Sequence, residues 1–143
     1  MKVRFNLALI LLAAILVVIS GCGKKDAEST ITLTYANFPP APTFPCVQME
    51  RWADEIEKRT NGKVKVNTFP GGTLLGARDM MDGVIAGQAD IGCLSMAYQP
   101  GRFRITNATS LPLDIPSATV ASKVLWDLYQ KYDPDAFKDV KVI

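Results

Sequence analysis

The chain has 143 residues, with 16 Lys and Arg against 14 Asp and Glu, and it contains no histidine. The lack of histidine removes the commonest general base, the usual zinc ligand and the Ser–His or Cys–His nucleophile pairs. The balanced charge, without a basic run, argues against nucleic-acid binding. We therefore expect no enzyme, no metal site and no cofactor.

The N-terminus has the pattern of an export signal. Lys2 and Arg4 precede an apolar run over residues 7–19, which is shorter than the roughly 20 residues that span a bilayer. Residues 19–22 (ISGC) resemble the lipobox of bacterial lipoproteins, which implies a lipid on the Cys22 thiol and cleavage just before that residue. The alternative is an ordinary signal peptide with a cysteine beside its cleavage site.

Three segments follow from this reading. We expect residues 1–21 to be a cleaved signal, residues 22–30 a polar tether and residues 31–143 the folded part. Cleavage would remove Lys2 and Arg4, leaving 14 basic and 14 acidic residues, so the mature chain would be formally neutral. Its 122 residues are enough for one small domain.

The first predicted elements are a strand and a helix. Residues 31–37 (ITLTYAN) are rich in β-branched and aromatic side chains, as strands are. A helix should begin around residues 44–46 and end at Asn61-Gly62, a pair that readily adopts left-handed backbone. Its expected buried face follows the i, i+3, i+4, i+7 spacing and consists of Met49, Trp52, Ala53 and Ile56.

The same alternation continues to the C-terminus. We expect strands at residues 63–68, 89–94 and 140–143, and a turn at residues 69–72 (FPGG). Between the strands, one helix should bury Ala77, Met80, Met81, Val84 and Ile85. A second helix, capped by Ser117 and stopped by Asp133-Pro134, should bury Ala121, Val124, Leu125 and Leu128. This order predicts an α/β lobe with a mostly parallel sheet and covering helices.

Several motifs in fixed order carry a family resemblance. They are TNGKVKV, FPGG, LG, DGVIAGQADIG, GRF and LPL, which lie between residues 60 and 113. Together they resemble the extracytoplasmic solute receptors of tripartite ATP-independent periplasmic (TRAP) transporters, the DctP-like subunits. The resemblance covers residues 31–143. It implies the first lobe of a periplasmic binding protein of type II-like fold, which closes with a second lobe over a small organic acid.

The resemblance also implies partners and a location. A receptor of this kind delivers a carboxylate to the integral membrane permease subunits of its transporter, and the lipid would anchor it on the periplasmic face of an envelope membrane. Family members are roughly twice as long, and their carboxylate-binding arginine lies beyond the part matched here. We therefore expect an incomplete lobe. The alternative function is a truncated or structural surface lipoprotein that binds no small molecule.

Candidate ligand contacts come from the loops that follow the strands, where ligands of open α/β sheets bind. Ser95 and Tyr98 are the favoured hydroxyl donors, and similar positions line the cleft in the family. Phe38 could wall the ligand or pack in the core, and Asn37 could bind it or bond locally in a turn. For residues 69–72 a structural role is favoured. For Arg102 and Arg104, the preferred interpretation is a solvated loop.

The two remaining cysteines lie in a compartment that permits disulfides. Cys46 is expected at a helix start and Cys93 at a strand end, both near the same edge of the sheet. A Cys46–Cys93 disulfide is one hypothesis, and two free thiols are the other. Bridging would require Cα atoms about 4.4–6.8 Å apart.

Overall fold

The structure is a computed structural model that describes residues 29–143. The predicted signal peptide and the lipid-bearing Cys22 lie outside the described residues. Within them, no helix has the length and apolarity required to cross a membrane.

A three-stranded parallel sheet forms the centre of the lobe, as the sequence predicts. Its strands are β1 (Ile31–Asn37), β2 (Val64–Phe69) and β3 (Ile91–Cys93), arranged in the order β2-β1-β3. Both strand pairs are parallel. The chain returns from β1 to β2 through a helix, the crossover that parallel neighbours require.

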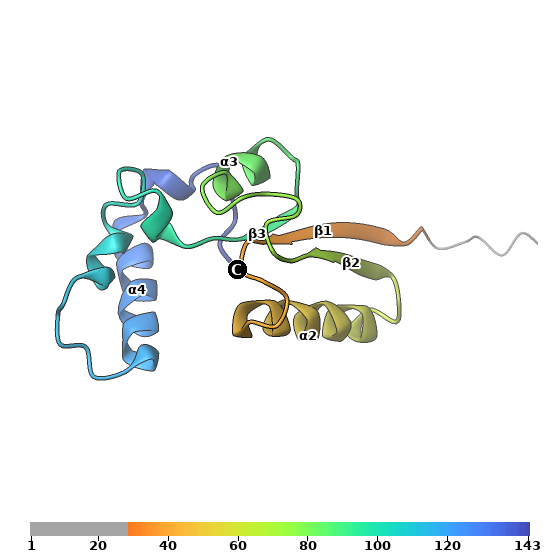
Figure 1. Ribbon diagram of the computed structural model, residues 1–143, viewed down its shortest axis with the longest axis horizontal. Coiled ribbons are helices and arrows are strands. Elements are labelled where there is room, and N and C mark those ends of the chain that lie inside the picture. The colour runs from red at the N-terminus through yellow and green to blue at the C-terminus, as the bar shows by residue number, and fades with distance from the viewer. Residues whose placement is uncertain (1–28) are drawn as a thin grey trace, which may run out of the picture.

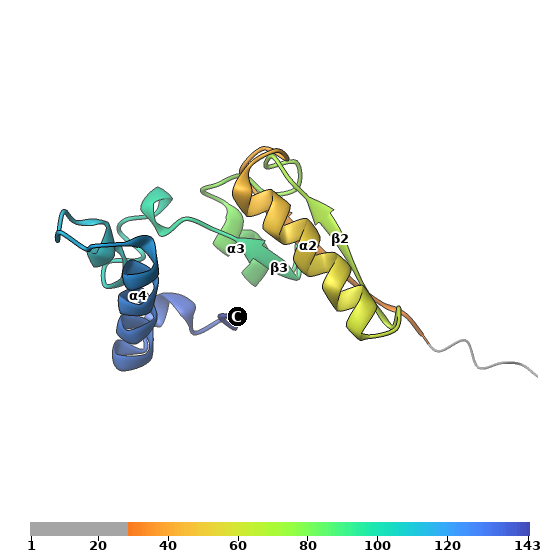
Figure 2. The ribbon, with the colours of Figure 1, turned by 90° about the horizontal axis from the view of Figure 1, so that it is seen from below.

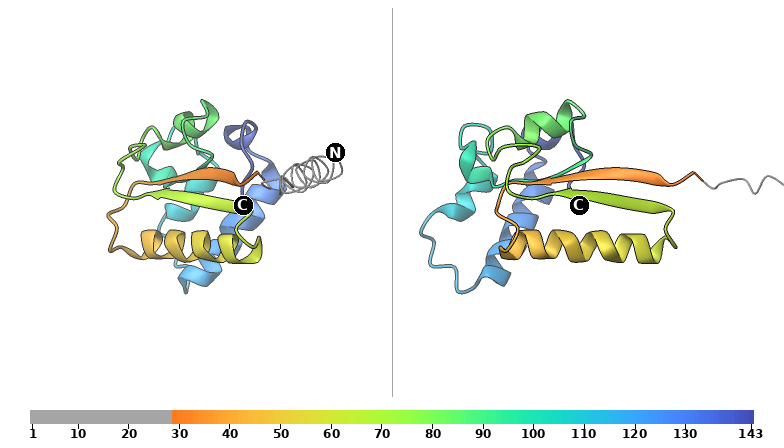
Figure 3. Two further views of the ribbon diagram at one scale, coloured as in Figure 1. Left: turned by 90° about the vertical axis from the view of Figure 1, so that its right-hand side faces the viewer. Right: turned by 45° about the vertical axis from the view of Figure 1, so that its right-hand side comes forward.

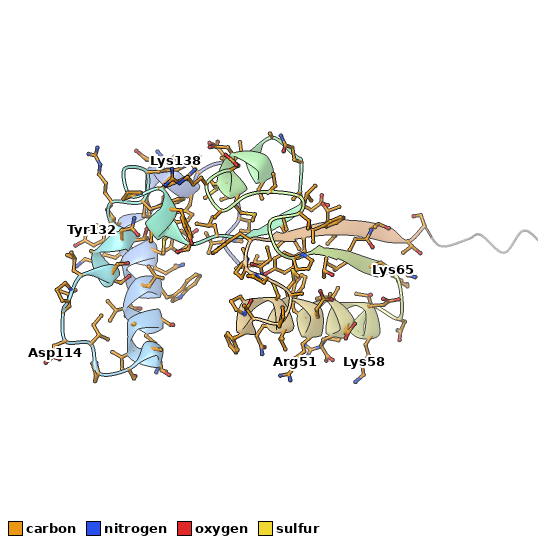
Figure 4. The ribbon with its side chains drawn as sticks, viewed as in Figure 1. Arg51, Lys58, Lys65, Asp114, Tyr132 and Lys138 are labelled. Carbon is orange, nitrogen blue, oxygen red and sulfur yellow. The ribbon has the colours of Figure 1, made fainter. Side chains whose placement is uncertain are left out.

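Two helices cover the two faces of the sheet (Figure 1). Helix α2 (Phe44–Arg59) packs on one face through Cys46, Met49 and Ala53, and Arg51 and Lys58 point away from the sheet (Figure 4). The shorter α3 (Met80–Ile85) lies on the other face.

The prediction that Trp52 is a core residue was wrong, because the side chain is 37% exposed. Its ring meets the Tyr35 ring edge-on at 5.7 Å, so it caps the margin of the interface between α2 and the sheet. Ile56 is only half-buried. Only α2 covers this face of the sheet, and no described element packs beside the helix. The edge of the apolar stripe of α2 therefore lies in solvent.

The hydrophobic core lies between the sheet and α3. Its buried cluster consists of Ala36, Leu75, Met80 and Ala89. Met80 and Met81, predicted as helix core, are 0% and 3% exposed. Gly92 allows this close packing, because a Cβ added there would lie 2.8 Å from Val84 Cγ2 and 3.0 Å from Met80 Cγ.

Asp90 attaches the start of β3 to β1. Its Oδ2 accepts a hydrogen bond from the Thr34 backbone N–H at 2.7 Å and another from Thr34 Oγ1 at 2.8 Å, while the Asp90 N–H donates to the Thr34 carbonyl at 3.1 Å. The backbone N–H of Thr34, and then its hydroxyl, hold the pKa of the Asp90 carboxyl below its usual value. The charged form is therefore favoured by folding.

This pair predicts a pH-dependent loss of stability. Because the pKa of Asp90 is lower in the folded than in the unfolded state, its contribution is present above about pH 4, the unfolded pKa, and is lost as the pH falls through the folded value. Asp90→Asn is expected to lower the free energy of unfolding at pH 7 by about 1 kcal/mol, a low value because the carboxyl is exposed. Urea unfolding at several pH values measures the effect.

The control for Asp90 is a double-mutant cycle with Thr34→Val. If the two substitutions act through the same hydrogen bonds, their combined effect is smaller than the sum of the single effects. A variant that remains equally destabilised at acidic pH would show that Asp90 acts by another route.

Helix α4 (Ala118–Tyr132) lies beyond the end of the sheet, away from α2 (Figures 1 and 2). Its ends match the prediction, since Ser117 Oγ accepts from the Val120 N–H at 3.2 Å and the helix stops at Asp133, before Pro134. The prediction that the apolar stripe of α4 is buried was wrong, because no α4 residue is fully buried. An apolar stripe is buried only where another element covers it, and little of the described chain lies against this helix.

The connections near α4 are short 3₁₀ helices, η1 (Met96–Tyr98), η2 (Thr106–Ser110) and η3 (Asp135–Phe137). Phe103 is 2% exposed and its ring contacts that of Phe137 at 5.2 Å. The prediction of a strand at residues 140–143 was wrong, because these residues have no regular structure. An alternating pattern becomes a strand only when a neighbouring strand takes its hydrogen bonds.

Candidate ligand-binding edge of the sheet

The loops after the strands meet at one edge of the sheet (Figure 3). The turn at residues 69–72 is joined to the loop after β1, because Gly71 N–H donates to the Pro39 carbonyl at 2.8 Å and Gly72 N–H to the Asn37 carbonyl at 3.0 Å. Both glycines have left-handed backbone, with φ of 70° and 68°. The turn therefore has the structural role that the sequence favoured, since other residues adopt this conformation only under strain.

Asn37 is the last residue of β1, and its side chain is 0% exposed. Neither Nδ2 nor Oδ1 has a hydrogen-bond partner. Local turn bonding through the side chain, the alternative role for this residue, is therefore not found. An unpaired buried amide costs about 1–3 kcal/mol, so each such group in a folded protein calls for an explanation. An acid could reach the amide only after the surrounding loops had moved.

Phe38 and Tyr98 come together from two of the predicted loops. Their rings meet nearly at right angles, with centroids 5.2 Å apart. Phe38 also packs against the core cluster, as core packing, one of its two expected roles, requires, while Tyr98 is 45% exposed. Ser95 is half-buried immediately before η1, and its side chain does not cap that helix. The structure thus brings the three residues to the edge where Asn37 lies.

Both cysteines are free thiols, so the disulfide hypothesis is not realised in the structure. Cys46 is buried, and its Sγ donates to the Pro39 carbonyl at 3.0 Å. Burial, and then the neighbouring Cys46, raise the pKa of the Cys93 thiol. The pKa of Tyr35 is raised by burial and by both thiols. Cys93 is therefore neutral at physiological pH and poorly suited to act as a nucleophile.

The two arginines of the third loop do not point to a carboxylate site. Arg102 forms an ion pair with Asp82 at 2.5 Å and lies near the Phe103 ring, while Arg104 is exposed. Within residues 29–143, no three His, Cys, Asp or Glu side chains gather as a metal ion would require.

A further hollow lies between β3 and α4. It measures about 700 Å³ and is lined by α3, β3, α4 and the C-terminal residues, with none of the four predicted contacts in its wall. Sequence reasoning missed this hollow, although the apolar stripe of α4 was a signal. It also missed the Thr34–Asp90 pair, whose members are 56 residues apart.

The fold and the polar edge define one α/β lobe of a solute-binding protein. The sequence profile of the bacterial extracellular solute-binding proteins, family 7 (DctP), matches residues 38–140, and the chain belongs to this family. The family is one of transport-associated binding proteins, not of enzymes, and its location is extracytoplasmic.

Solved structures agree with this assignment. A TRAP periplasmic solute-binding protein from Desulfovibrio salexigens is 62% identical, with a TM-score of 0.71 over 77% of this chain. A marine metagenome TRAP protein specific for aromatic acids, in complex with 3-hydroxybenzoate, is 29% identical, with a TM-score of 0.73 over 80%. A Rhodoferax ferrireducens TRAP protein with benzoate is 27% identical, with a TM-score of 0.72 over 80%.

The chain spans about a third of the length of these solved structures, since it covers 34%, 36% and 36% of them. It therefore corresponds to part of their fold, and the expectation of a partial lobe agrees with this coverage.

Proposed function

We propose that this chain is the solute-binding part of a TRAP-type transport system and that it captures a small organic acid for a membrane permease. Family membership supports the transport role. The relatives support a carboxylate, because similar proteins were solved with 3-hydroxybenzoate, benzoate and mandelate. Their ligands have a carboxylate and a ring in common.

The observation that carries the proposal is the Asn37 amide. It lies at the carboxyl end of the central strand, where ligands of open α/β sheets bind. Its two N–H donors have no acceptor inside the protein. A carboxylate accepts hydrogen bonds from such a group, so binding would satisfy the donors that folding leaves unpaired.

The neighbouring side chains fit the same ligand class. The rings of Phe38 and Tyr98 offer an apolar wall, and the hydroxyls of Ser95 and Tyr98 are further donors to a carboxylate. We propose Asn37, Phe38, Ser95 and Tyr98 as the contacts that this lobe supplies.

Nuclear magnetic resonance titration tests the proposal, because it detects the weak binding expected of one lobe. Benzoate, mandelate and pyroglutamate are added separately to ¹⁵N-labelled protein that begins at residue 23. Binding of at least one acid should shift the amide signals of Asn37, Phe38, Ser95 and Tyr98. Benzamide, which has the same ring without the charge, is the matched control ligand.

The proposal fails if none of the acids shifts these four signals, or if benzamide shifts them as strongly as benzoate. It also fails if the shifts lie around α4 and leave the edge of the sheet unchanged. Asn37→Ala should remove the shifts at the remaining three residues, since the amide is the proposed anchor.

We further propose that residues 1–21 are a cleaved export signal and that Cys22 carries a lipid, with residues 22–30 as the tether. The lipobox-like residues 19–22 support this assignment. Mass spectrometry of the N-terminal peptide from the membrane fraction should find a diacylglyceryl group on Cys22. A Cys22→Ser variant recovered in the same membrane fraction would contradict the anchor.

A further inference from the structure

We propose that Cys46 is a positioning residue for the acid-binding edge. Its thiol holds the loop after β1, residues 38–43, in place beside the Asn37 amide and thereby limits how readily an acid reaches that amide. The effect on acids rests on the proposed function, whereas the hold on the loop is measured without any acid.

The loop after β1 has few hydrogen-bond donors of its own. Three of its six residues, Pro39, Pro40 and Pro42, are prolines, which lack a backbone N–H. The N–H and the hydroxyl of Thr43 both donate to the Pro40 carbonyl, which closes a turn inside the loop. Neighbouring elements must therefore hold this loop through its acceptors.

The Pro39 carbonyl is the acceptor that joins the loop to two other elements. It accepts from the Gly71 N–H of the turn after β2 at 2.8 Å and from Cys46 Sγ in the first turn of α2 at 3.0 Å. Cys46 is 1% exposed. A thiol is a weak donor, but a hydrogen bond that is shielded from water is stronger than the same bond in solvent.

The Asn37 side chain lies on the face of the sheet that α2 covers. Ala36 faces α3, because it belongs to the cluster of Met80. Successive side chains of a strand point to opposite faces, so Asn37 faces α2, as Tyr35 does through its contact with Trp52. The loop joins this end of β1 to the first turn of α2 on the same face (Figure 3).

The burial of Asn37 makes the hold on the loop relevant to binding. Its amide is 0% exposed and unpaired, so an acid reaches it only when the cover at this end of β1 moves. The Cys46–Pro39 hydrogen bond joins the loop to the first turn of α2, and separating them breaks it. Loss of the bond therefore raises the fraction of open molecules, and the apparent affinity for an acid rises in proportion to that fraction.

Hydrogen exchange of the Asn37 side-chain amide measures this opening without an acid, in ¹⁵N-labelled protein that begins at residue 23. Cys46→Ala removes the donor and is expected to speed the exchange about two- to fivefold, the factor that one weak hydrogen bond represents. Cys46→Ser keeps a donor of similar size, so its amide should exchange as slowly as that of the unchanged protein.

Met49→Ala is the control for a general loosening of α2. Met49 is also 1% exposed on the inner face of this helix, but it has no donor group. Its truncation should lower the stability of the lobe and leave the exchange of the Asn37 amide unchanged. Circular dichroism checks the helicity of every variant, and the comparison of Cys46→Ser with Cys46→Ala decides the proposal even if Met49→Ala does not fold.

A benzoate titration of the same proteins measures the effect on binding. Cys46→Ala should lower the dissociation constant by about two- to fivefold, and Cys46→Ser should leave it unchanged. Faster exchange in Cys46→Ala, together with no shift by benzoate, mandelate or pyroglutamate in any variant, would reject the proposed function and support the hold on the loop.

The proposal is overturned if the Asn37 amide of Cys46→Ala exchanges as slowly as that of the unchanged protein. It is also overturned if Cys46→Ser exchanges as fast as Cys46→Ala, since the donor would then have no part in the effect. Equal acceleration by Met49→Ala, or equal affinity of the unchanged protein and Cys46→Ala for benzoate, would reject it as well.

Discussion

Replacing Asn37 by valine is expected to raise the free energy of unfolding by about 1–3 kcal/mol while abolishing the proposed binding of acids. The amide is fully buried and both of its polar atoms lack partners, so the folded state loses the hydrogen bonds that water gave the unfolded chain. Valine has no polar side-chain atom to leave unpaired, and it suits a strand. Urea unfolding and the titration of benzoate measure the two effects.

The matched control is Asn67→Val in β2. Asn67 is exposed in the strand next to β1, where it pairs with Thr34. This substitution reports the gain from strand propensity alone, which is smaller than about 1 kcal/mol. If Asn37→Val stabilises no more than Asn67→Val, the buried amide has no net cost. If the valine variant still binds the acid, Asn37 is not the anchor.

Replacing Met80 by alanine is expected to lower the free energy of unfolding by about 2–5 kcal/mol. Met80 is 0% exposed and belongs to the cluster that joins α3 to the sheet. Because Gly92 faces it without a side chain, no neighbouring group from β3 can fill the space that truncation would leave. The measurement is again urea unfolding, with the slope checked for a two-state transition.

Ile85→Ala is the control for Met80, since it removes a similar apolar volume from the same helix at a 40% exposed position. Its expected effect is well below that of Met80→Ala. Equal losses of stability for the two variants would indicate that helix propensity, and not the cavity, determines the result.

Met80 and Asn37 are both buried, but they are expected to have opposite effects on the stability of the lobe. Met80 supports the lobe by filling the space between α3 and β3, whereas Asn37 weakens the lobe through its unpaired amide. A solute-binding protein can tolerate such a cost at the position where it recovers hydrogen bonds on binding the solute. At Asn37, a substitution that raises the stability of this lobe is therefore expected to lower its proposed affinity for acids.

Much of the fold could be predicted from the sequence because its signals are local. The start of α4 at Ser117 and its end before Pro134 depend on residues within one helical turn. The three strands were placed within two residues of their observed bounds, and the crossover helix explains their parallel order. The motifs between residues 60 and 113 were enough to indicate the family, which the profile match over residues 38–140 confirms.

Burial and strand pairing were decided by the tertiary structure, because both depend on which elements cover a surface. Trp52 and the apolar stripe of α4 carry the periodicity of buried residues, yet Trp52 and Val124 are exposed and the other three stripe residues, Ala121, Leu125 and Leu128, are only half-buried. Residues 140–143 alternate like a strand but have no strand partner. Periodicity records which side chains suit a core, whereas burial and strand pairing require a second surface that the pattern cannot supply.

The same distinction applies to the candidate site. The predicted strand ends led to the expectation that Asn37, Phe38, Ser95 and Tyr98 lie at one edge, and in the structure the rings of Phe38 and Tyr98 are in contact. The burial of the Asn37 amide without a partner, the pairing of Thr34 with Asp90 and the hollow between β3 and α4 appeared only in three dimensions. Each depends on groups far apart in the chain, whose distances are set by packing and not by local sequence.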